Sequence, residues 1–97
     1  MYRNKKLLAH ANGAPCQYCG IQDGTVVAAH SNQLRDGKGV GFKSSDFRTA
    51  FLCFSCHNFC DGRDGNLSRQ ERIDLWEQAH RNTIGYLFEN GIIGVIK

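Results

Sequence analysis

Four of the five cysteines fall into two closely spaced pairs. Two residues separate Cys16 from Cys19, and two residues separate Cys53 from Cys56. This spacing lets both sulfurs of a turn meet the same tetrahedral ion, and two such pairs complete the coordination of one zinc ion. A closed sulfur site leaves no open position for a substrate, so the pattern predicts one structural zinc per chain. Two unrelated thiol pairs, or a redox-active dithiol, are the alternatives.

Cys60 is the remaining cysteine. An odd number of cysteines, together with an amino terminus that does not resemble a signal peptide, argues against a disulfide framework. We expect Cys60 to be buried as a small apolar residue. The alternative is that it competes with Cys56 or His57 as a metal ligand.

A second group of residues suits hydrolysis of a phosphodiester bond: His30, Asp46, His57 and Asp61. Asp61 follows His57 by four residues, so a helix would place both side chains on one face. Carboxylates and imidazoles together make a site for magnesium, manganese or zinc that keeps open positions for water and phosphate. The reaction needs a base that activates water and a cation that stabilises the leaving oxygen, and a neutral histidine suits the role of base. Each residue alone is typical of a packed or surface position.

The spacing of apolar residues predicts the elements that must position these groups. A short helix is expected over residues 4–11 and a strand over residues 25–29, with His30 at its end. Residues 47–54 are expected to form a second strand or the approach to a helix, and residues 53–61 a short helical segment. Residues 92–96 are expected to form a last strand or an apolar tail that packs on the core.

A long helix is expected after Ser68. Ser68 and Glu71 match a capping box, in which the serine accepts from a free backbone N–H and the glutamate reaches back. Apolar or small residues then recur every three or four positions, which predicts a stripe that faces the core. The stripe comprises Ile73, Trp76, Ala79 with His80, Thr83 with Ile84, and Leu87.

Length and composition are those of a small globular protein. The 97 residues are 41% apolar and 22% charged, which matches disordered, collagen-like and coiled-coil chains poorly. One domain over residues 1–97 is expected, and a chain this short often needs a metal to fold. The net charge of +3 permits nucleic-acid binding without requiring it. No apolar run approaches the length of a membrane span, so no contact with a membrane is expected.

Taken in order, these motifs resemble the HNH (ββα-metal) nucleases. The resemblance is closest to the small phage and prophage proteins of the YbcO type and to the related domain of a RecA-dependent phage nuclease. It covers roughly residues 7–88 and implies a small zinc-stabilised α+β domain with a long C-terminal helix. The segments that carry it are residues 28–32 (AAHSN), 37–41 (GKGVG), 45–46 (SD), 52–57 (LCFSCH) and 67–72 (LSRQER), with Trp76, Ala79 and His80.

The resemblance also implies roles for single residues. His30 matches the histidine that acts as general base, and His57 and Asp61 match positions that hold the catalytic metal, magnesium or manganese, with zinc as a further possibility. Asp46 is expected to belong to the catalytic group and stands where the family has the central asparagine of its motif, so it either braces the loop or binds the metal. Ala29 stands where many of these nucleases have another metal ligand.

Basic residues lie in or near the glycine-rich loop that is expected over residues 31–45. They could contact nucleic-acid phosphates, since the glycines let the backbone approach them. A flexible, solvated loop is the alternative. These residues are Arg35, Lys38, Lys43 and Arg48.

The expected function is therefore a metal-dependent DNA endonuclease of phage or prophage origin, acting in recombination or repair in the cytoplasm of a bacterial host. It is expected to be a monomer or a dimer, and a recombinase or another DNA-processing protein is a candidate partner. The alternatives are a non-catalytic zinc module that binds DNA or protein, and a redox or zinc-storage protein. His10 and His80 receive no role.

Overall fold

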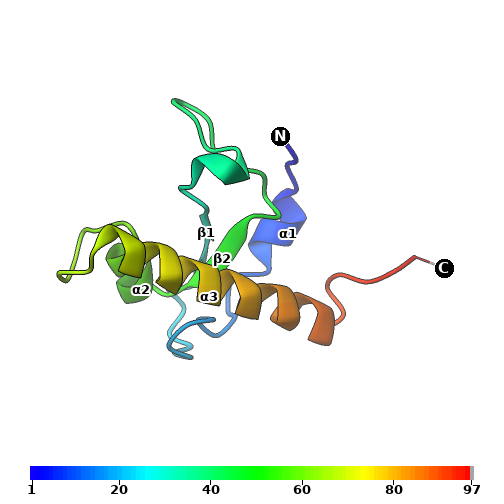
Figure 1. The fold of residues 1–97 in the computed structure, drawn as a ribbon. Helices are drawn as coiled ribbons and strands as arrows, with labels where there is room; N and C mark the ends of the chain where they lie inside the picture. The colour runs from blue at the N-terminus through cyan, green and yellow to red at the C-terminus, as the bar shows by residue number, and fades with distance from the viewer. Residues whose placement is uncertain (97) are drawn as a thin grey trace.

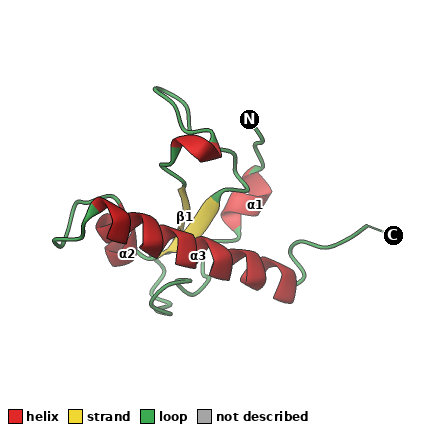
Figure 2. Ribbon diagram, in the orientation of Figure 1, coloured by secondary structure: helices red, strands yellow, loops and turns green. Residues whose placement is uncertain are grey.

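A computed structural model describes residues 1–96 and shows a small α+β structure built on a two-stranded sheet (Figure 1). Lys97, the last residue of the expected domain, lies outside the described residues. The elements in chain order are α1 (Lys5–Ala9), β1 (Val27–His30), the 3₁₀ helix η1 (Leu34–Asp36), β2 (Thr49–Leu52), α2 (Phe54–Cys60) and α3 (Arg69–Glu89). Long loops and turns connect these elements (Figure 2).

Strands β1 and β2 pair antiparallel and form the centre of the structure. Val27 lies opposite Leu52, and His30 lies opposite Thr49. All four residues of β2 are buried, whereas in β1 the one buried residue is Ala29. Within the segment over residues 47–54, the strand is therefore limited to Thr49–Leu52, and α2 begins at Phe54 after the N-cap residue Cys53.

Helix α3 lies across β2 (Figure 1) and supplies much of the core. Its first turn has the expected capping box, with hydrogen bonds from the Glu71 N–H to the Ser68 side chain and from the Ser68 N–H to the Glu71 carboxylate. The helix continues through Gly85 to Glu89. Its buried residues are spaced by about one turn, as the stripe predicted, with Leu75 in place of the half-buried Ile73. They are Leu75, Trp76, Ala79, Thr83 and Leu87.

Two side chains of α3 hydrogen-bond to the sheet. The hydroxyl of Thr83 accepts from the Phe51 N–H at 3.0 Å and donates to the carbonyl of Ala79 at 2.7 Å. The indole of Trp76 donates to the Ala29 carbonyl at 3.0 Å. Buried backbone groups of both strands thus obtain partners from the helix, which fixes how α3 lies on the sheet.

The terminal segments are shorter than predicted. Helix α1 begins after Asn4, whose side chain accepts from the Leu7 N–H, and ends at Ala9. After α3, Ile92 and Ile93 pack against the core, but Val95 and Ile96 are 87% and 98% exposed. No strand forms there within residues 1–96, so only the first part of the segment behaves as a packed tail. Over the same described residues, no helix combines the length and apolar character needed to cross a membrane.

Candidate metal and nuclease site

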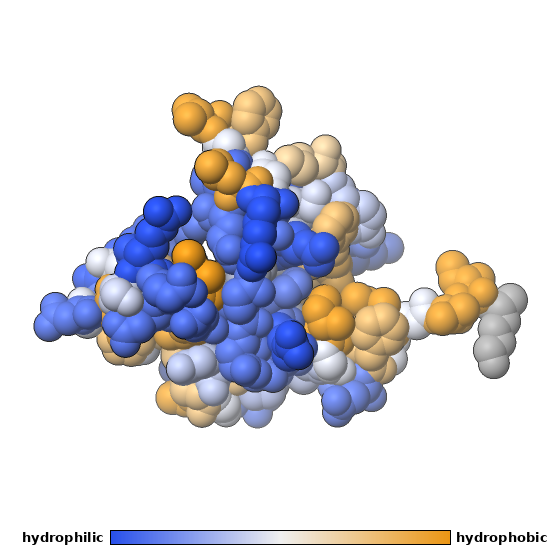
Figure 3. Space-filling model, viewed as in Figure 1, coloured by the Kyte–Doolittle hydropathy of each residue, from blue (hydrophilic) through white to orange (hydrophobic). Residues whose placement is uncertain are grey.

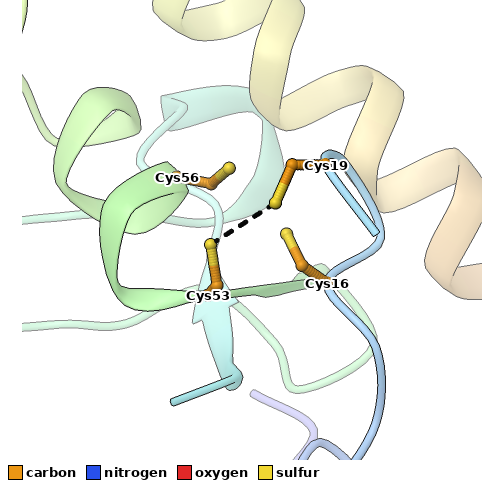
Figure 4. Close-up of side chains that lie close together, drawn as sticks. All are labelled: Cys16, Cys19, Cys53 and Cys56. Atoms are coloured by element: carbon orange, nitrogen blue, oxygen red, sulfur yellow. Dashed lines mark hydrogen bonds between the residues drawn. The ribbon is translucent and has the colours of Figure 1, made fainter. Parts of the chain in front are cut away.

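The four paired cysteines converge on one point. Their sulfur atoms all lie within 4.8 Å of one another, and the sulfurs of Cys19 and Cys53 are 3.7 Å apart (Figure 4). A tetrahedral zinc ion with Zn–S distances of about 2.3 Å requires sulfurs about 3.8 Å apart. The observed spacing and the all-thiol donor set therefore fit a zinc ion.

Local backbone geometry produces each half of this cluster. Cys16 and Cys19 lie on a turn that closes when the Gly20 N–H donates to the Cys16 carbonyl, and Gly20 has a φ of +84°, which favours glycine. Cys53 is the N-cap residue of α2, so Cys56 lies in the first turn of that helix. The Gln17 N–H donates to the Phe51 carbonyl at 2.8 Å and joins the first turn to β2.

The thiols of this cluster differ in pKa. Burial raises the pKa of Cys16, but hydrogen bonds from the backbone of Cys19, Cys53 and Tyr18 outweigh it and lower the pKa to about 7. Burial and the neighbouring sulfurs of Cys53 and Cys16 raise the pKa of Cys56. One thiolate thus forms readily and opposes the next, and a divalent cation removes that repulsion.

Cys60 is not one of the four converging thiols. It is 9% exposed, and its thiol lies 3.9 Å from the backbone carbonyl of Arg72. Burial, followed by the nearby charge of Asp61, raises its pKa to about 11. The expectation of a buried, small apolar residue is confirmed.

His30, at the end of β1, is held by Asp46. Their Nε2 and Oδ1 atoms lie 2.8 Å apart, and the Asp46 side chain is 3% exposed. Asp46 also accepts from the Asn4 N–H at 2.6 Å and from Arg3 at 3.0 Å. Burial raises the pKa of Asp46, but the hydrogen bonds from His30, Asn4 and Arg3 prevail and hold the pKa below its ordinary value. No local sequence pattern points to Arg3 as a partner of Asp46, because the two residues are 43 positions apart.

His57 and Asp61 lie on one face at the end of α2, as their spacing predicted. The imidazole Nε2 is 3.2 Å from Oδ2 of Asp61, and the amide of Asn32 donates to Oδ1 of Asp61 at 3.3 Å. Because Asn32 follows His30 by two residues, this contact brings the end of α2 to the end of β1. Adjacent ligands of an octahedral ion at about 2.1 Å lie about 3 Å apart, so the pair fits two positions of a magnesium or manganese ion.

Asp46 does not join this pair in a larger cluster. Among residues 1–96, the cysteines are the one set of three or more candidate ligands whose atoms converge. Asp46 instead bonds His30, Arg3 and the Asn4 N–H. Of the two roles left open for Asp46, the contacts favour the brace.

The basic residues of the loop between the strands differ in their surroundings. Arg35 forms an ion pair with Glu77 at 2.6 Å, and Arg48 lies 3.6 Å from Asp36. Lys38 and Lys43 form no ion pair within the described part of the chain.

The two histidines without a predicted role are accounted for by the fold. The imidazole of His80 stacks on Trp76, with ring centroids 4.8 Å apart, and its Nδ1 lies 2.7 Å from the Thr49 carbonyl oxygen. His10 is exposed at the end of α1.

Comparison with known proteins adds a family. Residues 5–91 match the family model described as "Putative nuclease YbcO". No curated protein and no solved structure gives a significant match.

Proposed function

The chain belongs to the YbcO family, and on that premise we propose that it is an HNH-type, metal-dependent DNA endonuclease forming one domain. His30 is the general base, Asp46 positions it, and His57 with Asp61 holds the catalytic magnesium or manganese ion. The four cysteines hold a structural zinc. The observation that carries the proposal is the hydrogen bond from Asn32 to Asp61, since it brings the His57–Asp61 pair to the strand end that bears His30.

The contact between His30 and Asp46 supports the assignment of the base. With the proton on Nε2, the imidazole donates to Asp46 and its Nδ1 lone pair is available to take a proton. After proton uptake, the carboxylate compensates the charge of the imidazolium. Because hydrogen bonds hold the pKa of Asp46 low, the carboxylate stays ionised at neutral pH and keeps the ring in this tautomer.

His57 and Asp61 are the chain's own contribution to the metal. An ion bound there supplies stabilisation of the charge on the phosphate and on the leaving oxygen. Asn32 holds the carboxylate of Asp61 by one oxygen, which leaves the other oxygen beside His57. Such hydrogen bonds orient a ligating carboxylate.

Sequence specificity is expected to be low, because the charges of the loop between the strands suit phosphates rather than base edges. Lys38 and Lys43 have no ion-pair partner among residues 1–96 and are the first candidates for phosphate contacts. Direction to particular DNA sites would then come from a partner such as a recombinase.

Nicking of supercoiled plasmid tests the proposal. Zinc-loaded wild type is incubated with magnesium or manganese and compared with His30→Ala and His57→Ala. The matched control is His10→Ala, because His10 is exposed on α1 and lies outside the proposed site. Zinc content and circular dichroism are measured for every variant.

We expect metal-dependent nicking by the wild type and His10→Ala, and a loss of about a hundredfold or more in the other two variants. Each variant should retain about one zinc per chain. A folded, zinc-loaded wild type that cuts neither plasmid nor branched or single-stranded DNA would contradict the proposal. Undiminished nicking by His30→Ala would remove His30 from the role of base.

A further inference from the structure

A cavity of about 370 Å³ lies beside the proposed metal pair. Its lining comes from residues 32–35, the end of α2 and the first half of α3. On this side of the molecule, the space-filling view shows a small apolar patch among hydrophilic residues (Figure 3). Asp61 and Asn32 line the cavity together with Arg69 and Arg72, and Ile73 and Trp76 add apolar surface. These two arginines and two apolar residues have no role in the proposed catalytic site.

The charges that line the cavity favour an anion. Arg35 also lines it but is paired with Glu77, which accepts from Gln33 as well. Arg69 and Arg72 have no carboxylate at ion-pair distance within residues 1–96. Two uncompensated guanidinium groups therefore share this surface with the single carboxylate of Asp61.

The side chain of Arg72 also lacks a hydrogen-bond partner at one of its nitrogen atoms. Its Nε is the one buried side-chain nitrogen or oxygen atom in the described residues that has no hydrogen-bond partner. The fold therefore does not use this guanidinium fully, although a buried polar group without a partner is costly. The guanidinium packs against Gly62, where a Cβ atom would lie 2.6 Å from Nη1, so the backbone there leaves room for it.

We propose, resting on the proposed nuclease function, that this cavity holds one unpaired nucleotide of the DNA strand being cut. Arg69 and Arg72 bind its phosphate, and the apolar surface of Leu34, Ile73 and Trp76 contacts its base. A guanidinium forms paired, charge-assisted hydrogen bonds with phosphate oxygens.

Cavity size selects the form of the substrate. Pockets for small molecules begin at about 300 Å³, so this one accommodates a single nucleotide unit. A base that is stacked and paired in a duplex cannot enter such a pocket without leaving the helix, which costs a few kcal/mol. Because Asp61 lines the same cavity, a nucleotide seated there has a neighbouring phosphodiester close to the metal pair. The preferred substrate is then DNA with an unpaired strand, such as a gap, a flap or a displaced strand.

Binding without cleavage tests this proposal. Zinc-loaded protein in buffer lacking magnesium and manganese is titrated into fluorescently labelled oligothymidylate and into a duplex of equal length, and anisotropy is recorded. The variants are Arg69→Ala, at an exposed position, and Arg72→Met, which keeps the apolar stem. The matched control is Arg81→Ala, because Arg81 is exposed on the same helix, has no ion-pair partner within residues 1–96 and lines a different depression.

We expect the wild type to prefer the single strand, and Arg69→Ala and Arg72→Met each to weaken that binding about tenfold. Each should also reduce the slope of log K against log salt by about 0.7, the value for one phosphate contact on a single strand. Arg81→Ala should change neither quantity. Equal losses in Arg69→Ala and Arg81→Ala, or a wild type that binds the duplex as tightly as the single strand, would overturn the proposal.

Failure of this inference and failure of the nuclease assignment give different results. A wild type that nicks plasmid but has no preference for single strands refutes the nucleotide cavity alone. A wild type that shows the expected arginine dependence but nicks no DNA supports the cavity and refutes the catalytic assignment alone.

Discussion

Replacement of Asp46 by asparagine tests the brace on which the proposed base depends. The carboxylate accepts hydrogen bonds from His30, Arg3 and the Asn4 N–H at 2.8, 3.0 and 2.6 Å, and 3% of the side chain is exposed. An asparagine keeps one acceptor oxygen, but its NH₂ group must face a donor. Asp46→Asn therefore loses at least one hydrogen bond to a buried charge.

The magnitude follows from these contacts. A hydrogen bond to a charged group contributes about 1.5–3 kcal/mol. The Arg3 side chain is 43% exposed, so its ion pair adds less than about 1 kcal/mol. Because the three bonds share one carboxylate, their contributions do not add. We expect Asp46→Asn to lower the free energy of unfolding by about 2–3 kcal/mol, a large part of the stability of a small domain.

Urea unfolding of the zinc-loaded protein measures this loss. Trp76 is the single tryptophan and is 4% exposed, so its fluorescence reports unfolding of the core. The matched control is Asp64→Asn, which makes the same charge change at an exposed position. It should change the stability by less than about 0.5 kcal/mol. If Asp46→Asn lies within that margin of the control, the reasoning about the brace is wrong.

The lowered pKa of Asp46 gives this prediction a direction with pH. The ionised carboxylate stabilises the fold above the unfolded pKa of about 4, and this contribution is lost as the pH falls through the lower folded value. The carboxyl-carbon NMR signal of Asp46 should therefore stay at its ionised position down to about pH 4. A signal that titrates above that pH would contradict the structure.

Two further predictions concern the metal and the docking of α3. Removing zinc with a chelator should unfold the chain, because binding of a structural zinc supplies about 10 kcal/mol or more of folding free energy. We expect the circular dichroism signal of the helices to be lost and to return when zinc is added. A fold that persists without zinc would refute this prediction. Thr83→Val, which keeps the side-chain volume, leaves the Phe51 N–H without its partner and should cost about 1–3 kcal/mol in urea unfolding, whereas an unchanged stability would show that the hydroxyl does not fix α3 on β2.

Local sequence patterns were sufficient to predict several parts of the fold. The two-residue gap in each cysteine pair fits a turn that brings two sulfurs together, so a four-cysteine cluster that could bind zinc was predictable from spacing alone. The capping box placed the start of α3 at Ser68, and the three-to-four spacing identified its buried face. His57 and Asp61 share a face for the same reason, since helical geometry repeats within one turn.

Other features came only from how the elements dock. The sequence left open whether Asp46 braces the loop or binds the metal. Its partners Arg3 and Asn4 lie more than 40 positions away, and no local periodicity relates them to Asp46. Arg69 and Arg72 are three residues apart on α3, but the approach of α2 places them beside Asp61. Hydrophobic spacing determines which face of an element is buried, whereas the partner of each polar side chain depends on the packing of distant segments. Local spacing was therefore enough to predict which cysteines converge and which helical faces are buried, because both depend on neighbouring residues. The surroundings of His30 and the cavity depend on how distant segments pack.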